Sequence, residues 1–318
     1  MSRQDTARDA IEALMAGYEK LGYVSDEQIA TALFLAQKLE KPLLVEGPPG
    51  VGKTELAKAT AEYLGLNMIR LQCYEGLDEG KALYEWQYGK QLLYTQVLKE
   101  KLGDVMQGAK TLDESMTRLG GFEDVFFSEQ FLQTRPLLEA LRADDGVVLL
   151  IDEIDKADIE FPNDLLQELD RMEFYVYETG ETIKAEQRPL VIITSNNEKE
   201  LPDAFLRRCF FHYISYPDAD TMSQIVNVHY PDIKDRLVKS ALSSFYEVRD
   251  VPGLKKKPST SELLDWLKLL MNEDIDPETL REQDAGKMIP PLHGALIKNE
   301  QDVHLFERLA FLARRERN

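Results

Sequence analysis

Cysteine, positive charge and long apolar runs are all scarce in this sequence. Its two cysteines, Cys73 and Cys209, are far apart and form no CxxC pair, which argues against a disulfide framework and against a zinc site built on cysteine. Nowhere do about 18 apolar residues follow one another, and the N-terminal segment has no apolar core flanked by basic residues. We therefore expect no membrane insertion, and a reducing compartment, the cytoplasm, as the location.

The chain carries 57 acidic residues against 38 basic ones, for a net charge of -19. This balance is the opposite of the positive charge that binding to a phosphate backbone needs, so nucleic acid is not an expected partner. An acidic surface favours a partner with basic patches, although a solvated acidic face without a partner is the commoner meaning of such a balance.

Length and apolar content predict two domains. The 318 residues are 43% apolar, and they exceed the roughly 250 to 300 residues that a single hydrophobic core usually serves. We expect an α/β domain over residues 1–218 and a smaller all-α domain over residues 219–318.

Hydrophobic spacing predicts the elements of both domains. Apolar residues recur at three- and four-residue intervals in the segments that we expect to be helices, namely 9–21, 25–39, 54–64, 221–228, 233–245, 261–271 and 303–315. Either Ser25 or Asp26 caps the second of them. Short apolar runs predict strands at 42–46, 68–71, 147–151 and 190–194. The alternation predicts a doubly wound α/β domain, and two β-rich arms predict a hairpin over 173–185.

A glycine-rich segment lies between the strand expected at 42–46 and the helix expected at 54–64. It consists of Gly47, Pro48, Pro49, Gly50, Val51, Gly52, Lys53 and Thr54, which satisfies the P-loop pattern. In that pattern, backbone amides at a helix N-terminus cradle phosphates, the lysine ammonium meets their charge, and the threonine hydroxyl binds Mg²⁺. The segment therefore predicts a site for ATP and Mg²⁺.

Two adjacent carboxylates, Asp152 and Glu153, follow the apolar run at 147–151. We expect them at the carboxyl end of a strand, where ligands bind in open α/β sheets. Asp152 would hold the Mg²⁺ shell and Glu153 would polarise the attacking water, a division of roles that suits phosphoryl transfer. Such a pair is, by itself, more often a helix cap or the start of a loop, but the P-loop upstream favours the catalytic interpretation.

Polar residues also follow the strand expected at 190–194. We expect the amide of Asn196 to orient water near the terminal phosphate and Asn197 to form the turn, although both asparagines are alternatively exit-turn residues. The pair Arg207 and Arg208 predicts an arginine finger that reaches the nucleotide of a neighbouring subunit, with Arg208 favoured. Pairing with surface carboxylates is the alternative.

These motifs, in this order and over residues 22–290, resemble the AAA+ superfamily and more closely its MoxR-like branch. GPPGVGKT matches the Walker A motif, VVLLIDEID matches Walker B, and TSNN matches sensor 1. In LPDAFLRRC, Arg208 falls where the branch has its finger arginine, and the expected hairpin falls where the branch has its pre-sensor 1 hairpin. The segment LQCYEGLDEGKALYEWQY is similar to that of the CoxD-type ATPases, which are encoded with carbon monoxide dehydrogenase maturation genes.

The resemblance implies a P-loop NTPase fold, with a parallel sheet flanked by helices followed by a small all-α lid. It also implies hydrolysis of Mg-ATP in a homohexameric ring and a partner with a von Willebrand factor A domain that holds a metal-ion-dependent adhesion site. Its members are thought to act as chaperone-like factors in metalloenzyme maturation, so a molybdenum enzyme is among the clients it suggests. Tyr23 and Val24 lie where AAA+ proteins contact adenine.

One segment departs from the family pattern, and another has two interpretations. Where MoxR-like proteins have a sensor 2 arginine, residues 257–262 read KPSTSE, and Ser261 is expected at the arginine position. Either Lys256 or Lys257 substitutes from the loop, or coupling of the lid to the nucleotide is weak. Separately, Tyr84, Trp86 and Tyr88 alternate with polar residues; they either line a central pore and grip a client or pack against the sheet.

Together, these patterns predict a Mg-ATP-dependent AAA+ ATPase that changes the conformation of a protein client. The runner-up is a nucleotide-dependent scaffold or switch that assembles with a von Willebrand A-domain partner without motor activity, which the weak sensor 2 region supports. DNA remodelling is third, because a net charge of -19 disfavours it.

Overall fold

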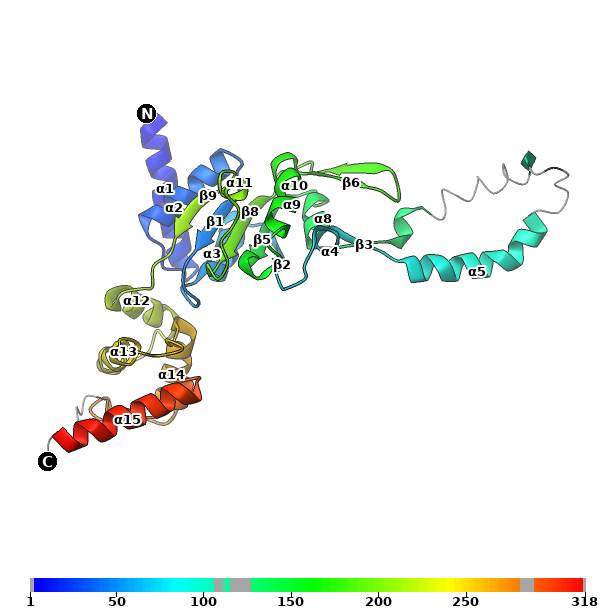
Figure 1. Cartoon of the computed structure of the whole chain (residues 1–318). Coiled ribbons are helices and arrows are strands. Elements are labelled where there is room, and N and C mark those ends of the chain that lie inside the picture. Colours follow the sequence, from blue (N-terminus) through cyan, green and yellow to red (C-terminus); the bar gives the residue numbers. More distant parts are fainter. Residues whose placement is uncertain (1–2, 106–110, 112, 115–126, 281–288, 317–318) are drawn as a thin grey trace. The chain divides into compact units, whose positions relative to one another are not determined.

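A five-stranded sheet forms the centre of the computed structural model, which describes residues 3–105, 111, 113–114, 127–280 and 289–316 (Figure 1). The strand order is β2-β5-β8-β1-β9. The strands are β1 (Leu43–Glu46), β2 (Asn67–Gln72), β5 (Val147–Asp152), β8 (Leu190–Ser195) and β9 (Phe210–Tyr213). The pairs β1/β8, β5/β8 and β2/β5 are parallel, which confirms the four strands predicted from apolar runs.

The middle of this sheet is covered on both faces. All six residues of β5 are buried, and so are five of the six in β8, as expected for apolar runs in a parallel sheet flanked by helices. The flanking helices include α2 (Glu27–Lys38), α3 (Lys53–Leu64), α8 (Pro136–Leu141), α9 (Phe161–Asp164), α10 (Leu166–Arg171) and α11 (Asp203–Leu206). Asp26 caps α2, since its Oδ1 accepts the Ile29 N–H at 2.8 Å. Strand β9 was not predicted, because it is a short edge strand whose Phe211 and Tyr213 are exposed.

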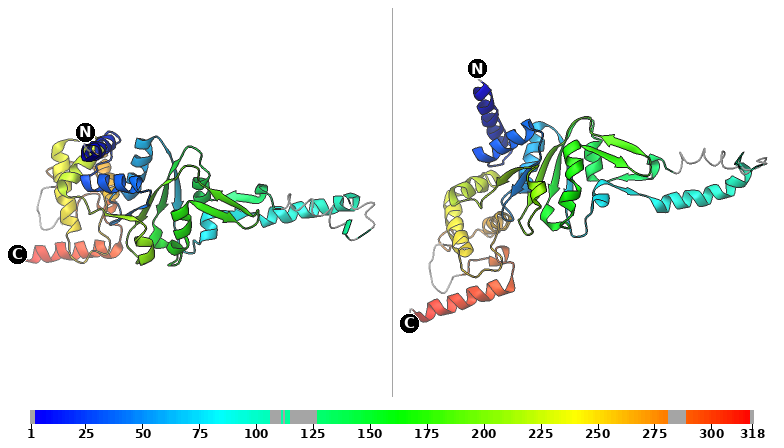
Figure 2. Two further views of the ribbon diagram at one scale, coloured as in Figure 1. Left: turned by 90° about the horizontal axis from the view of Figure 1, so that it is seen from above. Right: turned by 45° about the horizontal axis from the view of Figure 1, so that its top comes forward.

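Two further pairs of strands lie outside the sheet. The predicted hairpin is confirmed as β6 (Glu173–Val176) paired with β7 (Glu181–Lys184). A second antiparallel pair, β3 (Tyr84–Trp86) with β4 (Leu132–Thr134), was not predicted. Around it lie α4 (Glu79–Leu83), α5 (Tyr88–Val105) and the short 3₁₀ helix η1 (Glu129–Phe131). In every view α5 extends away from the sheet (Figures 1 and 2).

Helix α5 was also missed, and its surface explains why. Tyr88, Leu92, Leu93 and Val97 are all exposed, and at their spacing they do not share one face of a helix. Its exposed apolar residues therefore form no single stripe, which is the pattern that identified the other helices.

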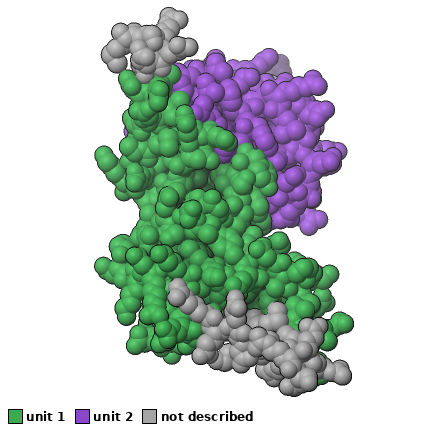
Figure 3. Space-filling model, turned by 90° about the vertical axis from the view of Figure 1, so that its left-hand side faces the viewer, with its two compact units in different colours: residues 1–30, 47–56, 213–318 green, residues 31–46, 57–212 purple. Residues whose placement is uncertain are grey.

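By its contacts the chain divides into two compact units, shown in Figure 3. Unit 2 comprises residues 31–46 and 57–212, and unit 1 comprises residues 1–30, 47–56 and 213–318. The P-loop segment thus belongs to the unit that contains the C-terminal helices. The boundary placed between residues 218 and 219 from the sequence stays a prediction.

Where the structure describes it, the C-terminal part of unit 1 has helices and no strands, as predicted. Its helices are α12 (Ala219–His229), α13 (Asp235–Arg249), α14 (Thr260–Asn272), the short 3₁₀ helix η3 (His293–Ala295) and α15 (Glu300–Glu316), and the same unit contains α1 (Arg3–Lys20). Phe245, Trp266 and Phe306 are fully buried in one core formed by α12 to α15. Asp218 caps α12, and Ser259 with Glu262 forms a capping box on α14.

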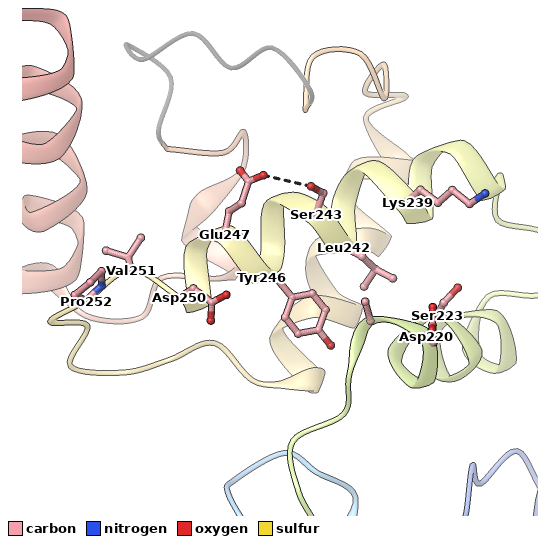
Figure 4. A pocket seen from close by; sticks show the side chains of 11 residues that line it. Asp220, Ser223, Lys239, Leu242, Ser243, Tyr246, Glu247, Asp250, Val251 and Pro252 are labelled. Atoms are coloured by element: carbon pink, nitrogen blue, oxygen red, sulfur yellow. Dashed lines mark hydrogen bonds between the residues drawn. The ribbon is translucent and has the colours of Figure 1, made fainter. Parts of the chain in front are cut away.

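A groove of about 850 Å³ lies on unit 1 between α12 and α13 (Figure 4). Leu242 and Tyr246 face it from α13. Three carboxylates, Asp220, Glu247 and Asp250, also line it, against one lysine, Lys239. The charged side chains that line this groove are therefore mainly acidic.

Both cysteines are free thiols, as the sequence predicted. Burial raises the pKa of Cys73 and that of Cys209 to about 12, so each thiol stays protonated at neutral pH and is a poor nucleophile. Within the described ranges, no helix is long and apolar enough to cross a membrane.

We expect Leu149→Ala in β5 to destabilise the protein by about 2 to 5 kcal/mol, because this side chain is only 1% exposed and its removal leaves a cavity in a covered sheet. Leu39→Ala is the matched control, since Leu39 is 58% exposed, and it should cost less than about 0.5 kcal/mol. Urea denaturation of both variants measures the difference. Equal shifts would show that β5 does not lie in the core.

Candidate functional site

The P-loop segment turns around its own lysine. It leads from β1 into α3, whose first residue is Lys53. The Lys53 side chain is almost completely buried, and its Nζ donates to the carbonyl oxygens of Gly47 at 2.6 Å and Pro48 at 3.0 Å. An ammonium held by carbonyls inside its own loop is a preformed positive centre for an anion at the N-terminus of α3.

Two P-loop glycines lie so close to other residues of unit 1 that a side chain would not fit at either position. Gly50 has φ +79°, and a Cβ there would lie 2.5 Å from the Ser259 Cβ, at the start of α14. A Cβ on Gly47 would collide with the carbonyl oxygen of Ile214. These positions therefore need glycine because the loop packs closely against other residues of unit 1.

The predicted adenine-contacting residues lie in the same unit. A Cβ on Gly52 would be 3.5 Å from the Tyr23 ring, so Tyr23 is a neighbour of the P-loop. Its ring packs edge-on against Tyr18 at 5.6 Å between centroids, and burial raises the pKa of the Tyr23 phenol, which stays protonated. Val24 follows in the chain and is half-buried. Contact of either residue with adenine stays a prediction.

Asp152 ends β5 as a buried carboxylate, only 2% exposed. Its Oδ1 accepts the Thr194 hydroxyl at 2.5 Å, and its Oδ2 accepts Arg70 Nη2 at 2.5 Å. Burying a carboxylate is costly unless it is paired and hydrogen-bonded, and both partners are present here. Arg70 was not predicted as a site residue, and Thr194 was predicted only as part of the TSNN motif, although each lies on a strand neighbouring β5.

Glu153 follows in the left-handed conformation, at φ +58° and ψ +52°. That backbone costs of order 1 to 3 kcal/mol in a non-glycine residue and marks sites where the surroundings enforce it. The Thr194 Oγ1 accepts the Glu153 N–H at 2.8 Å. The Glu153 carboxylate accepts from Gln72 Nε2 at 2.9 Å and Lys156 Nζ at 2.8 Å, both on Oε2, and from Asn196 Nδ2 at 3.3 Å on Oε1. The bond to Glu153 raises the pKa of Lys156.

The two asparagines after β8 have different positions. Asn196 is half-buried, and its amide reaches Glu153, so the structure brings together these two predicted catalytic side chains. Asn197 is exposed, has φ +58°, and its N–H donates to Ser195 Oγ at 2.9 Å. Asn197 is thus the turn residue, as predicted, which leaves Asn196 for the site.

The two candidate finger arginines also differ. Arg208 Nε donates to Asp170 Oδ2 at 2.6 Å, and its Nη1 donates to the Ala204 carbonyl at 2.9 Å. Arg207 is exposed. In the single chain Arg208 therefore pairs with a surface carboxylate, which was the alternative interpretation, and a role of either arginine at a neighbouring subunit stays a prediction.

The segment expected to hold sensor 2 is built around the cap of α14. Ser259 is the N-cap, and Ser261, expected at the arginine position, is exposed in the first turn. Lys256 pairs with Glu262 at 2.9 Å, while Lys257 is exposed. Lys256 is thus tied to the helix start, and which lysine, if either, serves as sensor 2 stays open.

Two of the aromatic residues Tyr84, Trp86 and Tyr88 are packed and one is exposed, and a role in lining a pore stays a prediction. Trp86 is buried and packs against Phe131 of η1, which lies outside the five-stranded sheet. Tyr84 packs against Phe174, and its hydroxyl donates to Glu178 Oε2 at 2.6 Å. Tyr88 is 65% exposed, with its hydroxyl 3.2 Å from Glu178 Oε1.

The donor set fits Mg²⁺ bound together with a nucleotide. Among the residues the structure describes, no three His, Cys, Asp or Glu side chains are grouped to hold a metal. Mg²⁺ is usually held by one or two protein oxygens together with substrate phosphates and water, rather than by an all-protein cage. Asp152 is a carboxylate and Thr54 has a hydroxyl, and both are ligand types that suit that arrangement.

A protein-family model described as "ATPase family associated with various cellular activities (AAA)" matches residues 43–217. The match covers more than half of the 318 residues. It begins at the first residue of β1 and ends after β9, and so includes the P-loop, Asp152, Glu153, Asn196 and both arginines. The five-stranded sheet with its flanking helices is accordingly the α/β fold of P-loop NTPases, as predicted.

We expect Thr194→Val to destabilise the protein by about 1 to 3 kcal/mol, because it removes the hydroxyl that donates to Asp152 and accepts the Glu153 N–H without changing the side-chain shape. Thr182→Val on the exposed strand β7 is the control and should change the free energy of unfolding by less than about 0.5 kcal/mol. Chemical denaturation gives both values. A Thr194→Val variant as stable as the wild type would contradict this bridging role.

Proposed function

Because the chain belongs to the AAA family of ATPases, we propose that it hydrolyses Mg-ATP and uses hydrolysis to change the conformation of a protein client. The observation that carries this proposal is the contact of Glu153 with Asn196 at the carboxyl ends of β5 and β8. A carboxylate and an amide that converge there, on a sheet whose β1 leads into a P-loop, have the residue types that phosphoryl transfer to water requires.

Nucleotide binding is assigned to the P-loop. The backbone amides of residues 47–54 would hold the phosphates, and Lys53 would exchange the carbonyls of Gly47 and Pro48 for phosphate oxygens. Thr54 and Asp152 would hold Mg²⁺, which when bound neutralises charge on the phosphates. Tyr23 and Val24 are the proposed contacts of the adenine.

Glu153 is the proposed acceptor of the attacking water's hydrogen bond. A carboxylate oxygen has about two lone pairs. Oε2 already accepts from both Gln72 and Lys156, whereas Oε1 accepts one long hydrogen bond from Asn196. Oε1 is therefore the atom that would orient the water, with the Asn196 amide beside it to position that water.

The proposal includes a homohexameric ring, in which Arg208 of one subunit contacts the nucleotide of the next. The position of Arg208 in the segment LPDAFLRRC, which is similar to the finger segment of the branch, supports it, and Arg208 would exchange Asp170 for the nucleotide of the next subunit. Arg207 is the alternative finger.

For the client, we propose the chaperone-like maturation role of the MoxR-like branch, with the CoxD-type ATPases as the nearest kind. Its partner would be a von Willebrand A-domain protein, and a molybdenum enzyme a candidate client for cofactor insertion. Exposed aromatic side chains on the hairpin support contact with a protein, because Tyr177 is 79% exposed and Tyr175 is 46% exposed. The cytoplasm, where free thiols persist, is the proposed location.

A scaffold or switch that binds ATP and assembles with the same partner, without motor activity, is the second candidate. The absence of an arginine from residues 257–262 favours it, because lid movement would then be weakly coupled to the phosphates.

We expect Glu153→Gln to lower ATP hydrolysis by about 10²- to 10⁴-fold, because it removes the proton acceptor, while leaving ATP affinity unchanged. Lys53→Ala should instead abolish ATP binding. Glu160→Gln, an exposed neutralisation nearby, is the control. Phosphate release and fluorescent-nucleotide titration measure the two effects. A Glu153→Gln variant that keeps its cellular function would favour the scaffold over the remodelling ATPase.

An intersubunit finger predicts complementation between inactive variants. Arg208→Ala and Glu153→Gln should each hydrolyse ATP at least about 100-fold more slowly than the wild type. Mixed, they should regain activity, since some interfaces then combine an intact Glu153 with an intact Arg208. A mixture of Lys53→Ala with Glu153→Gln is the control and should stay inactive, because both defects lie on the same side of the interface. Full activity of a chain with both Arg207→Ala and Arg208→Ala would rule out the finger.

A further inference from the structure

Asp155 is a buried carboxylate that belongs neither to the P-loop nor to the Asp152-Glu153 pair. It lies in the 3₁₀ helix η2 (Ile154–Lys156), directly after β5, and is only 2% exposed. Its Oδ2 accepts two backbone N–H groups, from Asn196 at 3.1 Å and from Glu198 at 3.0 Å. Both donors belong to the turn that follows β8.

A second contact joins the same two segments. Lys199 Nζ donates to the carbonyl oxygen of Ala157 at 3.0 Å. Asn197 lies between the two donors in the left-handed conformation, which asparagine tolerates in turns. Besides the contact of Asn196 with Glu153, three hydrogen bonds thus join the turn after β8 to the segment after β5, and Asp155 accepts two of them.

These bonds set the position of the backbone from which the Asn196 side chain extends. Asn196 Nδ2 reaches Glu153 Oε1 at 3.3 Å, near the limit for a hydrogen bond, so a small displacement of the turn would break the contact. A misplacement of about 1 Å can cost a catalytic group about 100-fold in rate. The Asp155 carboxylate touches neither of the atoms proposed to orient water.

We propose that Asp155 is a positioning residue for hydrolysis, which holds Asn196 at the distance from Glu153 that the reaction needs. This rests on the proposed function, since it assigns Asp155 a part in the same site. Asp155 acts through Asn196. Replacing Asp155 should therefore slow hydrolysis no more than replacing Asn196 does.

Two substitutions of Asp155 separate its role as a hydrogen-bond acceptor from its negative charge. Asp155→Ala removes the acceptor of both N–H groups. Asp155→Asn keeps an oxygen that can accept them and removes the charge, and its NH₂ group would replace Oδ1, which has no hydrogen-bond partner among the described residues. The matched control is Asp158→Ala, because Asp158 is exposed, follows in the same segment and bonds to the N–H of Gly76 instead.

The test is a double-mutant cycle on the full-length chain, with kcat, KM and the dissociation constant of a fluorescent ATP analogue measured for each variant. Asp155→Ala should lower kcat by about 10- to 100-fold, with nucleotide affinity unchanged, and Asp155→Asn should lower it less. Asp155→Ala combined with Asn196→Ala should be no slower than Asn196→Ala alone. Losses in kcat that multiply, or a parallel loss of nucleotide affinity, would overturn the proposal.

Hydrogen–deuterium exchange is a measurement that does not depend on turnover. Made on Asp155→Asn, it still tests the proposal if Asp155→Ala folds poorly. In Asp155→Asn the neutral amide oxygen is a weaker acceptor than the carboxylate, so the amides of Asn196 and Glu198 should exchange faster than in the wild type and in Asp158→Ala, and more slowly than in Asp155→Ala. Unchanged exchange would overturn the positioning role. A wild-type chain that binds ATP but does not hydrolyse it would instead refute the proposed function, whereas an active wild type with multiplying losses refutes only the role of Asp155.

Discussion

The site depends on the two hydrogen bonds that the Thr194 hydroxyl makes. The hydroxyl donates to Asp152 and accepts the N–H of Glu153, so one side chain of β8 fixes the Asp152 carboxylate and the Glu153 backbone at the end of β5. Parallel pairing of β5 with β8 brings that hydroxyl to the right level, because the carboxyl ends of parallel strands meet at one edge of the sheet. The same bond holds the Glu153 backbone in its left-handed conformation. This conformation is strained, and in it the Glu153 carboxylate reaches Asn196.

Much of this arrangement was predictable from local patterns. Buried strands appear as apolar runs, and the P-loop, the carboxylate pair and the amides each lie where such a run ends. The hairpin was marked by its turn, and the C-terminal helices by their periodicity and caps. These features are local in the sequence, since the residues that specify each one lie within a few positions of one another.

The unpredicted features depend on contacts between distant residues. Arg70 pairs with Asp152 across 82 positions, and Asp155 meets Asn196 across 41. An arginine on a strand and a third acidic residue after a motif are ordinary in a sequence, and only strand order makes them neighbours. Helix α5 was missed for the opposite reason, because its exposed apolar residues pack too little to impose a periodicity. The division of Tyr84, Trp86 and Tyr88 between packed and exposed positions likewise follows from β3 pairing with β4.

Mass determination by light scattering with and without Mg-ATP, together with steady-state phosphate release from the same sample, tests the central claim most directly. Ring ATPases require the nucleotide and a neighbouring subunit at each site, so we predict a hexamer with Mg-ATP and turnover that rises with assembly. A monomer that binds ATP without turnover would contradict the remodelling ATPase and favour the partner-dependent scaffold or switch.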